Sequence, residues 1–289
     1  KLVVDKNRRI DFLNLGHDVS CNFKEALQRC SVVIDCTPAG NVNKEKYYKN
    51  HLKCSMFIAQ GSEKGFGVPF AYNINDCVFK NKTTPRFVQI VSCNTHAISR
   101  VMRSLSIDGG DNFTAGDFVC IRRANDASQD DGFVSSPTCG KHDDAEFGTH
   151  HARDVFDLLQ TSHPDVYRDI SSSAMKVNTQ YMHSVRFSVT LNESNLSREE
   201  AIERFESDKM VTLTHHKTAN RVFSFGRDHG FYGRIYNQVV INRDSVHVMH
   251  TNPGETKVMG FAFTPQDGNS LLSSAVAVLR GLHGEKYIR

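Results

Sequence analysis

The sequence predicts two domains of different fold class, an α/β domain with a parallel sheet and an α+β domain with an antiparallel sheet. Continuous apolar, β-branched runs separated by helix-like segments occupy the first third of the chain. Such runs are typical of parallel strands buried on both faces. Later strands alternate apolar and polar residues, as half-buried antiparallel strands do. The apolar, helically spaced segment 269–282 predicts a helix that docks back on the first domain.

The first domain has three predicted strands, each ended by polar residues or glycine. They are "SVVIDC" (31–36), "CSMFIAQG" (54–61) and "FVQIVSC" (87–93), and residues 23–30 have helical spacing. In parallel sheets the ligand crevice lies at the carboxyl ends of the strands. The stretches "DCTPAG", "AQGSEKG" and "SCNTH" are therefore predicted at those ends.

The second domain mixes helices with alternating strands. Its first predicted elements are a helix at 94–105, a strand at 117–123, a polar loop at 124–147, a helix at 151–160 and a strand at 185–191. Ser197 and Glu200 match a capping box, which predicts the start of another helix. "MVTLT", "QVVIN", "SVHVMH" and "KVMGFAF" read as further strands.

Composition limits the class of protein. The chain has 289 residues and a net charge of +3, so charge gives no reason to expect a nucleic acid or an acidic membrane as partner. No apolar run has the length of a membrane span, and no secretory signal is visible. Eight cysteines without a CxxC pair predict free thiols in a reducing cytoplasm and no metal site. A zinc site at Cys139, His142, His150 and His151 is the alternative.

Cys93 stands between a strand-like and a helix-like stretch in "RFVQIVSCNTH". The amino terminus of a helix stabilises a thiolate through its N–H groups and its dipole. Asn94 and Thr95 add polar groups that can cap the helix. This position favours a nucleophile, whereas a buried structural thiol is the alternative because free cysteines are often buried.

Five motifs occur in order along the chain: "VVIDCTPAG", "AQGSEK", "VSCNTHAISR", "IRRANDAS" and "THHARDV". Together they resemble the archaeal-type (class II) glyceraldehyde-3-phosphate dehydrogenases, best from Phe23 to Val155. The resemblance implies a Rossmann-like NAD(P)-binding domain in residues 1–92 and 266–289 and a catalytic domain in 93–265. It also implies NAD or NADP as cofactor, a phosphorylated aldehyde and inorganic phosphate as substrates, and a homotetramer.

The resemblance assigns the chemistry to Cys93 and a histidine. Cys93 would attack the aldehyde carbon, hydride would pass to the nicotinamide, and phosphate would release the thioester as an acyl phosphate. A general base must take the hemithioacetal proton, and His183 in "QYMHSVRFSVTL" is the closest match. His150 and His151 are the fallback candidates for this base.

The remaining site residues follow from the same motifs. The implied substrate contacts are Ser92, Asn94, Thr95, His150, His151, Ala152 and Arg122. The implied cofactor contacts are Thr37, Pro38, Gly61, Ser62, Arg123 and Gly254. Three positions depart from the family pattern: Ser62 replaces a glycine, His96 stands where threonine is frequent, and Gly254 stands where a glutamine lies near the nicotinamide.

Two expectations concern the start of the chain and the competing functions. No Gly-x-Gly-x-x-Gly turn precedes "FKEAL", and 22 residues are too few for a βαβ unit of roughly 30 residues. We therefore expect that an amino-terminal cofactor segment has been cut away from this sequence, with its natural loss as the alternative. The alternatives to the phosphorylating dehydrogenase are another thioester-forming enzyme, such as an aspartate-semialdehyde type, and a catalytically silent binding or assembly relative.

Overall fold

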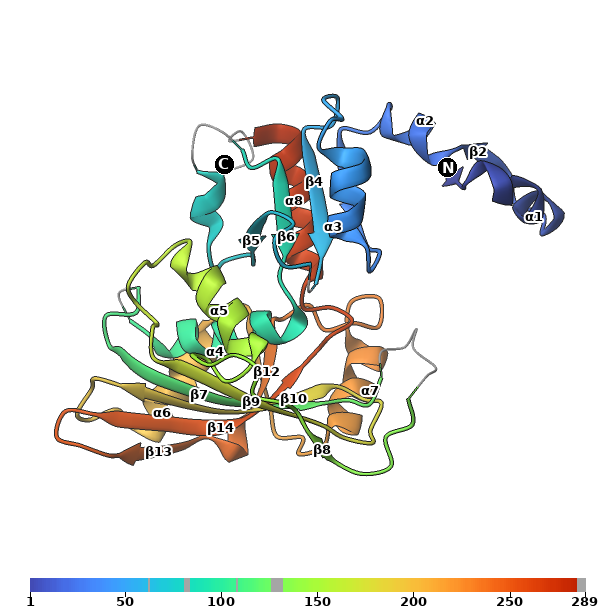
Figure 1. The fold of residues 1–289 in the computed structure, drawn as a ribbon. Coiled ribbons are helices and arrows are strands. Elements are labelled where there is room, and N and C mark those ends of the chain that lie inside the picture. Colours follow the sequence, from blue (N-terminus) through green and yellow to red (C-terminus); the bar gives the residue numbers. More distant parts are fainter. Residues whose placement is uncertain (62, 81–83, 108, 126–131, 285–289) are drawn as a thin grey trace. The chain divides into compact units, whose positions relative to one another are not determined.

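The computed structural model describes residues 1–61, 63–80, 84–107, 109–125 and 132–284, and the chain divides into two compact units (Figure 1). The first unit consists of Lys1–Val68, Phe79–Gln89 and Ala275–Arg289, and the second of Pro69–Val78 and Ile90–Ser274. The predicted α/β fold class with a Rossmann-like part and a larger sheet is confirmed. The cofactor and catalytic roles of the predicted domains stay predictions.

The first unit is built on the predicted apolar strands. Its sheet has the order β3 (Val32–Asp35), β4 (Met56–Gln60), β6 (Phe87–Ile90) and β5 (Val68–Phe70). β3 and β4 are parallel, with Asp35 opposite Ala59. The helices are α2 (Phe23–Leu27), α3 (Gly40–Asn43) with a following π-helical turn (Lys44–Tyr48), a 3-10 turn (Asp76–Phe79) and α8 (Leu271–His283).

The first residues of the chain fold into a small strand–helix–strand unit. β1 (Leu2–Val3) and β2 (Val19–Cys21) are parallel, with a 3-10 turn (Lys6–Arg8) and α1 (Arg9–Asn14) between them. The expectation that these residues are too few for a βαβ arrangement is wrong. Strands of two and three residues and a helix of six make the connection shorter than in an ordinary unit.

The second unit contains an 8-stranded mixed sheet in the order β11-β12-β14-β10-β7-β9-β8, with β13 paired to β14. The strands are β7 (Phe113–Arg122), β8 (Thr138–Cys139), β9 (Ile170–Lys176), β10 (His183–Leu191), β11 (Val211–Thr214), β12 (Val239–Asn242), β13 (His247–His250) and β14 (Thr256–Thr264). The predicted antiparallel pairing holds for β7, β10 and β14, whereas β7 with β9 and β11 with β12 are parallel.

Helices cover both faces of this sheet. α4 (Cys93–Leu105), α5 (His150–Gln160) and α6 (Arg198–Ser207) share one apolar core with Ile241 and Ala262. α7 (Ala219–His229) packs instead with Val240 and Phe263. Successive side chains of a strand point to opposite faces, so α7 lies on the other face. We call the two faces the α4 face and the α7 face. A further 3-10 turn spans Arg243–Ser245.

α4 is buried along most of its length and carries a charged residue into the core. The Arg100 guanidinium, 3% exposed, donates to the Gln238 side chain at 2.8 Å and to Asp208 at 3.0 Å, and also to the carbonyls of Tyr72 and Asn73. Burial lowers the pKa of Arg100, and Asp208 opposes that shift. Arg100 therefore ties α4 to the loop after β5.

Removing this arginine is expected to destabilise the second unit strongly. Arg100→Met removes the cation that pairs with Asp208 and the donor to the Asn73 carbonyl, so we expect the free energy of unfolding to fall by about 3–5 kcal/mol. Urea unfolding followed by circular dichroism measures this. Arg227→Met is the control, because Arg227 pairs with Asp228 on the exposed surface, where it should contribute little. Equal effects of the two substitutions would contradict this account.

In the described part of the chain, no helix is both long and apolar enough to cross a membrane.

Candidate active site

Cys93 is the first residue of α4. The hydroxyl of Ser92 caps the helix by accepting the Thr95 N–H at 3.2 Å, and it also hydrogen-bonds the Thr95 hydroxyl at 2.8 Å. Cys93 is half-buried, whereas Asn94 and Thr95 are buried. The predicted strand-to-helix junction is therefore present, and the thiol lies where the helix dipole favours a thiolate. The side chains of Ser92 and Thr95, predicted to bind substrate, hydrogen-bond each other.

The start of α4 lies close to His183. The Thr264 hydroxyl donates to the side-chain oxygen of Asn94 at 3.4 Å, and Thr264 pairs directly with His183 across β14 and β10. Side chains two residues apart on a strand point to the same face of the sheet. His183 therefore points to the same face as Val185, and Thr264 to the same face as Ala262. Val185 and Ala262 belong to the core on the α4 face. Nucleophile and histidine therefore share one face of the sheet.

An N–H donor lies beside each nitrogen of the His183 ring. The Arg123 backbone N–H donates to His183 Nδ1 at 2.9 Å. When Nδ1 accepts this bond, a neutral ring carries its proton on Nε2. The side-chain amide of Gln266 lies on the other side, 2.8 Å from Nε2, and Gln266 Oε1 accepts the His183 backbone N–H at 3.2 Å. The Gln266 side-chain nitrogen is also a donor, so a neutral imidazole accepts either from Arg123, with its proton on Nε2, or from Gln266, with its proton on Nδ1.

The double histidine begins α5. Both ring nitrogens of His151 are buried without a hydrogen-bond partner among the described residues, and its ring lies 4.0 Å from that of the exposed His150. Burial, with smaller contributions from His150, Arg122 and His183, lowers the pKa of His151 to about 3. His151 is therefore neutral at physiological pH and electrostatically coupled to His183 and Arg122.

The backbone at the start of α5 is already hydrogen-bonded within the protein. The N–H of His151 donates to the Thr149 hydroxyl at 3.4 Å, and that of Ala152 to the Ser172 hydroxyl at 3.0 Å. Ala152 itself is fully buried. These two N–H groups are occupied, so a phosphate at this helix end would need other donors, and the side chains of His150 and His151 are available for that role.

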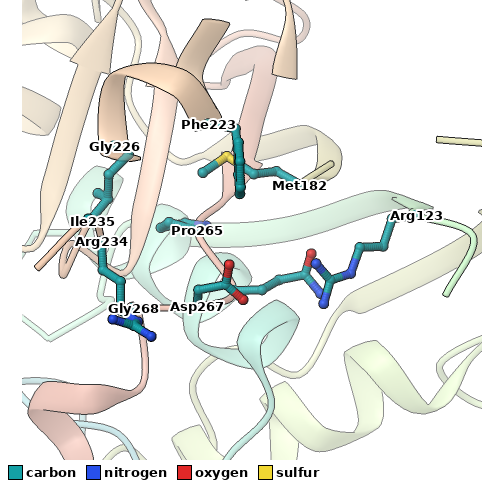
Figure 2. Close-up of a pocket in the computed structure, with 11 residues that line it drawn as sticks. Arg123, Met182, Phe223, Gly226, Arg234, Ile235, Pro265, Asp267 and Gly268 are labelled. Carbon is teal, nitrogen blue, oxygen red and sulfur yellow. The ribbon is translucent and has the colours of Figure 1, made fainter. Parts of the chain in front are cut away.

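The side chains of the neighbouring Arg122 and Arg123 lie on different faces of the sheet. Arg122 shares strand parity with Cys120 on the α4 face, and its charge influences His151. Arg123 instead lines a pocket with Met182, Phe223 and Gln266 (Figure 2). Its side chain therefore lies away from Arg122, although its backbone N–H holds His183.

The predicted cofactor residues of the first unit lie after two adjacent parallel strands. Thr37 and Gly61 each stand two residues beyond the paired Asp35 and Ala59. Burial alone would raise the pKa of Asp35, but hydrogen bonds from Thr37, Asn43 and Tyr48 hold it below its usual value. Gly61 has φ +72° and open space around its α-carbon, so backbone can be approached closely there. Pro38 is exposed, and Ser62 lies outside the described residues.

Gly254 is separated from His183. It lies in the turn between β13 and β14, where the nearest atom to an added Cβ would be the side chain of Asn192. Thr256 begins β14 and Thr264 ends it opposite His183, so Gly254 lies at the far end of the strand. The glutamine that contacts His183 is Gln266. Among the described residues, no group of three or more His, Cys, Asp or Glu side chains is placed to hold a metal ion.

One segment that the sequence analysis did not single out holds this site together. Gln266 contacts His183, the Asn269 side chain donates to the carbonyl of Cys93 at 3.0 Å, and Ser273 contacts His96. We call residues 264–273 the strap. The sequence contains one signal for this segment, the glutamine in "FTPQDGNS". It follows an apolar strand, and a polar side chain at the end of a strand is a candidate site residue.

These features describe a protein with a Rossmann-like parallel sheet in one unit and, in the other, a cysteine and a histidine on one face of the larger sheet. Curated glyceraldehyde-3-phosphate dehydrogenases are similar to this chain. That of Sulfolobus acidocaldarius is 27% identical over 270 residues, covering 90% of this chain and 72% of the relative. That of Pyrobaculum neutrophilum is 27% identical (81% and 66%), and that of Archaeoglobus fulgidus 26% (86% and 70%). No protein-family model matches the chain.

The sequence resemblance is thereby confirmed: the chain is a homologue of the archaeal-type glyceraldehyde-3-phosphate dehydrogenases. The general class that follows is an oxidoreductase. The chain spans 66% to 72% of the length of these three relatives.

The buried histidines predict acid sensitivity. Burial is the main cause that lowers the pKa of His151 to about 3 and that of His96 to about 4, both below the ordinary 6.5. At a pH between the lowered pKa values of the folded state and the ordinary value of 6.5, the unfolded chain binds more protons than the folded one. The free energy of unfolding should therefore fall as the pH drops below about 6.5. Urea unfolding between pH 7.5 and 5 tests this. His151→Gln should flatten the dependence, and an unchanged slope in this variant would contradict the assignment.

Proposed function

We propose that this protein is a phosphorylating glyceraldehyde-3-phosphate dehydrogenase, in which Cys93 forms a thioester with the oxidised substrate. The observation that carries the proposal is the half-buried cysteine at the start of α4, on the same face as His183. The homology supports the class of reaction, and the phosphorylating step is our inference from it. A homotetramer in the cytoplasm is the expected state of such an enzyme.

Cys93 supplies the covalent step. Its thiolate attacks the aldehyde carbon, forming a C–S bond while the C=O electron pair moves to oxygen. The bound nicotinamide cofactor supplies the hydride acceptor. Loss of the hydride from that carbon restores the C=O bond and gives a Cys93 thioester. Phosphate then attacks the thioester carbon, and the Cys93 thiolate leaves.

His183 acts on the oxygen of the hemithioacetal. With Nδ1 accepting from Arg123, the ring presents an N–H at Nε2, which suits a developing alkoxide. Acting as a general base through Nε2 requires the other tautomer, with the proton on Nδ1 and the hydrogen bond from Arg123 broken. The Gln266 side-chain nitrogen, a donor beside Nε2, supports that second tautomer, so the two contacts of the ring correspond to the two roles, alkoxide stabilisation and proton abstraction.

Arg122 and the double histidine supply the phosphate-recognising groups. Arg122 provides a guanidinium, and His150 and His151 provide ring N–H donors at the start of α5. His151 has buried nitrogens without described partners, so a bound phosphate would satisfy an otherwise costly group. We propose that these three side chains select the phosphorylated aldehyde.

Thr37, Pro38 and Gly61, all in the first unit, are the proposed cofactor contacts. Thr37 and Gly61 follow neighbouring parallel strands, where dinucleotides bind in such folds, and the open α-carbon of Gly61 allows a ligand to come close. These residues fit a nicotinamide dinucleotide.

The proposal is tested by following NAD(P)H formation with glyceraldehyde 3-phosphate, with and without inorganic phosphate. We expect turnover that requires both the aldehyde and phosphate. Turnover with aspartate semialdehyde alone would favour the related enzyme class. A folded protein that is inactive with every combination of aldehyde and cofactor would favour the silent binding or assembly relative.

A further inference from the structure

His96 is completely buried in the first turns of α4, three residues after Cys93. Burial lowers the pKa of its ring to about 4, so the ring is neutral near pH 7. Both nitrogens are hydrogen-bonded: Nδ1 lies 2.9 Å from the carbonyl oxygen of Ser92, and Nε2 lies 2.9 Å from the hydroxyl of Ser273 in the strap. A buried neutral imidazole with two partners is a rigid connector between them.

The proton positions in this connection follow from its two ends. The Ser92 carbonyl can only accept, so Nδ1 carries the ring proton and Nε2 is the acceptor. At the other end, the Tyr72 backbone N–H donates to the Ser273 oxygen at 2.9 Å, which leaves the Ser273 hydroxyl proton for His96 Nε2. The chain of donors therefore runs from Tyr72 through Ser273 and His96 to Ser92 without conflict.

The end of this chain is the peptide bond that precedes the nucleophile. The Ser92 carbonyl accepts both the His96 ring N–H and the His96 backbone N–H, the latter at 3.0 Å. The same peptide unit contains the nitrogen of Cys93, so its plane sets the direction of the Cys93 side chain. The following carbonyl, that of Cys93, is fixed by Asn269 of the strap. Strap residues thus fix the backbone on both sides of Cys93.

We propose that His96 is a positioning residue: through its Nδ1 hydrogen bond to Ser92 it holds the peptide before Cys93, and with Ser273 it couples the nucleophile to the strap. The strap also carries Gln266, which holds His183. Nucleophile and histidine are therefore aligned by one short segment. The kinetic part of this inference rests on the proposed dehydrogenase function, whereas the reactivity of Cys93 does not.

Two amide substitutions separate the two ends of the imidazole. In His96→Asn the side-chain nitrogen takes the place of Nδ1 and can still donate to Ser92, whereas in His96→Gln the amide takes the place of Nε2 and reaches only Ser273. The test is the rate of alkylation of Cys93 by iodoacetamide at fixed pH, read from the Cys93 peptide by mass spectrometry. Peptide-level detection is needed because Cys36 and Cys139 are exposed.

We expect His96→Gln to slow alkylation about five- to tenfold, which corresponds to the loss of one buried hydrogen bond. His96→Asn should stay within about twofold of the unsubstituted protein for the same reason. In turnover, His96→Gln should lower kcat and leave KM nearly unchanged. His163→Gln is the control, because His163 contacts Arg103 and Ser162 and no residue of the strap.

Several results would overturn this role. Equal rates in the two variants, or a loss in His96→Asn alone, would show that the Nδ1 contact does not position Cys93. Should His96→Gln fail to fold, Ser273→Ala removes the strap contact and keeps the Nδ1 bond; an unchanged alkylation rate there would contradict coupling to the strap. If alkylation follows the prediction but the unsubstituted protein has no dehydrogenase activity, the positioning role stands and the proposed function fails.

Discussion

Cys93→Ser is expected to lower the rate of aldehyde oxidation by at least about a thousandfold, while the protein remains folded. A serine hydroxyl at this position is far less ionised than a thiol, and the helix dipole of α4 cannot make up the difference. The assay is NAD(P)H formation, and circular dichroism checks the fold. The side chain is half-buried at the helix start, so the substitution removes little packing.

Cys120→Ala is the matched control for this experiment. Cys120 lies on β7, on the α4 face, and burial, with a smaller contribution from Cys93, raises its pKa to about 12. A thiol in that state is not a nucleophile at neutral pH. We expect activity within a few-fold of the unsubstituted protein. Activity lost in Cys120→Ala but kept in Cys93→Ser would reverse the assignment of the nucleophile.

The second large effect concerns His183 and separates its two possible roles. In His183→Asn the side-chain oxygen can accept the Arg123 N–H in place of Nδ1, but nothing replaces Nε2. In His183→Gln the amide nitrogen can replace the Nε2–H donor. Loss of a catalytic donor or base lowers rates by about 10²–10⁴, so His183→Asn should slow acylation by that amount.

The comparison of the two variants decides the mechanism. If His183 stabilises the alkoxide as a donor, His183→Gln should keep at least about tenfold more activity than His183→Asn, because one hydrogen bond to a charged group contributes about 1.5–3 kcal/mol. If His183 is a general base, both variants should be equally slow. Single-turnover measurements of the hydride step, before phosphate is added, report this directly. His151→Asn is the control, and a larger loss there would place the chemistry on His151.

Much of the fold could be predicted because the patterns are local. The apolar runs that became β3, β4 and β6 are continuous, and the alternation in β10 reflects one buried face. The capping box at Ser197 and Glu200 is present. The small unit at the amino terminus was missed because its elements are too short to show a period. The parallel pairing of β7 with β9 depends on the crossover through α5, which strand patterns do not encode.

The site was predictable only in part, for a related reason. Cys93 was identified by the local change from strand to helix. Gln266, Asn269 and Ser273 contact residues far away in the sequence, so no spacing rule pointed to them. The donor to His183 Nδ1 is a backbone N–H, and any residue type at position 123 except proline offers the same group. Gly254 was chosen by loose motif similarity, and the structure separates it from His183.

The central claim is that Cys93 carries the oxidised substrate as a thioester. The most direct measurement is the mass of the protein after incubation with glyceraldehyde 3-phosphate and NAD(P) in the absence of phosphate, followed by peptide mapping. We predict one 3-phosphoglyceroyl group on the Cys93 peptide, formed together with one equivalent of NAD(P)H and removed when phosphate is added. NAD(P)H formed without an acyl group on Cys93, or an acyl group that persists in Cys93→Ser, would contradict the account.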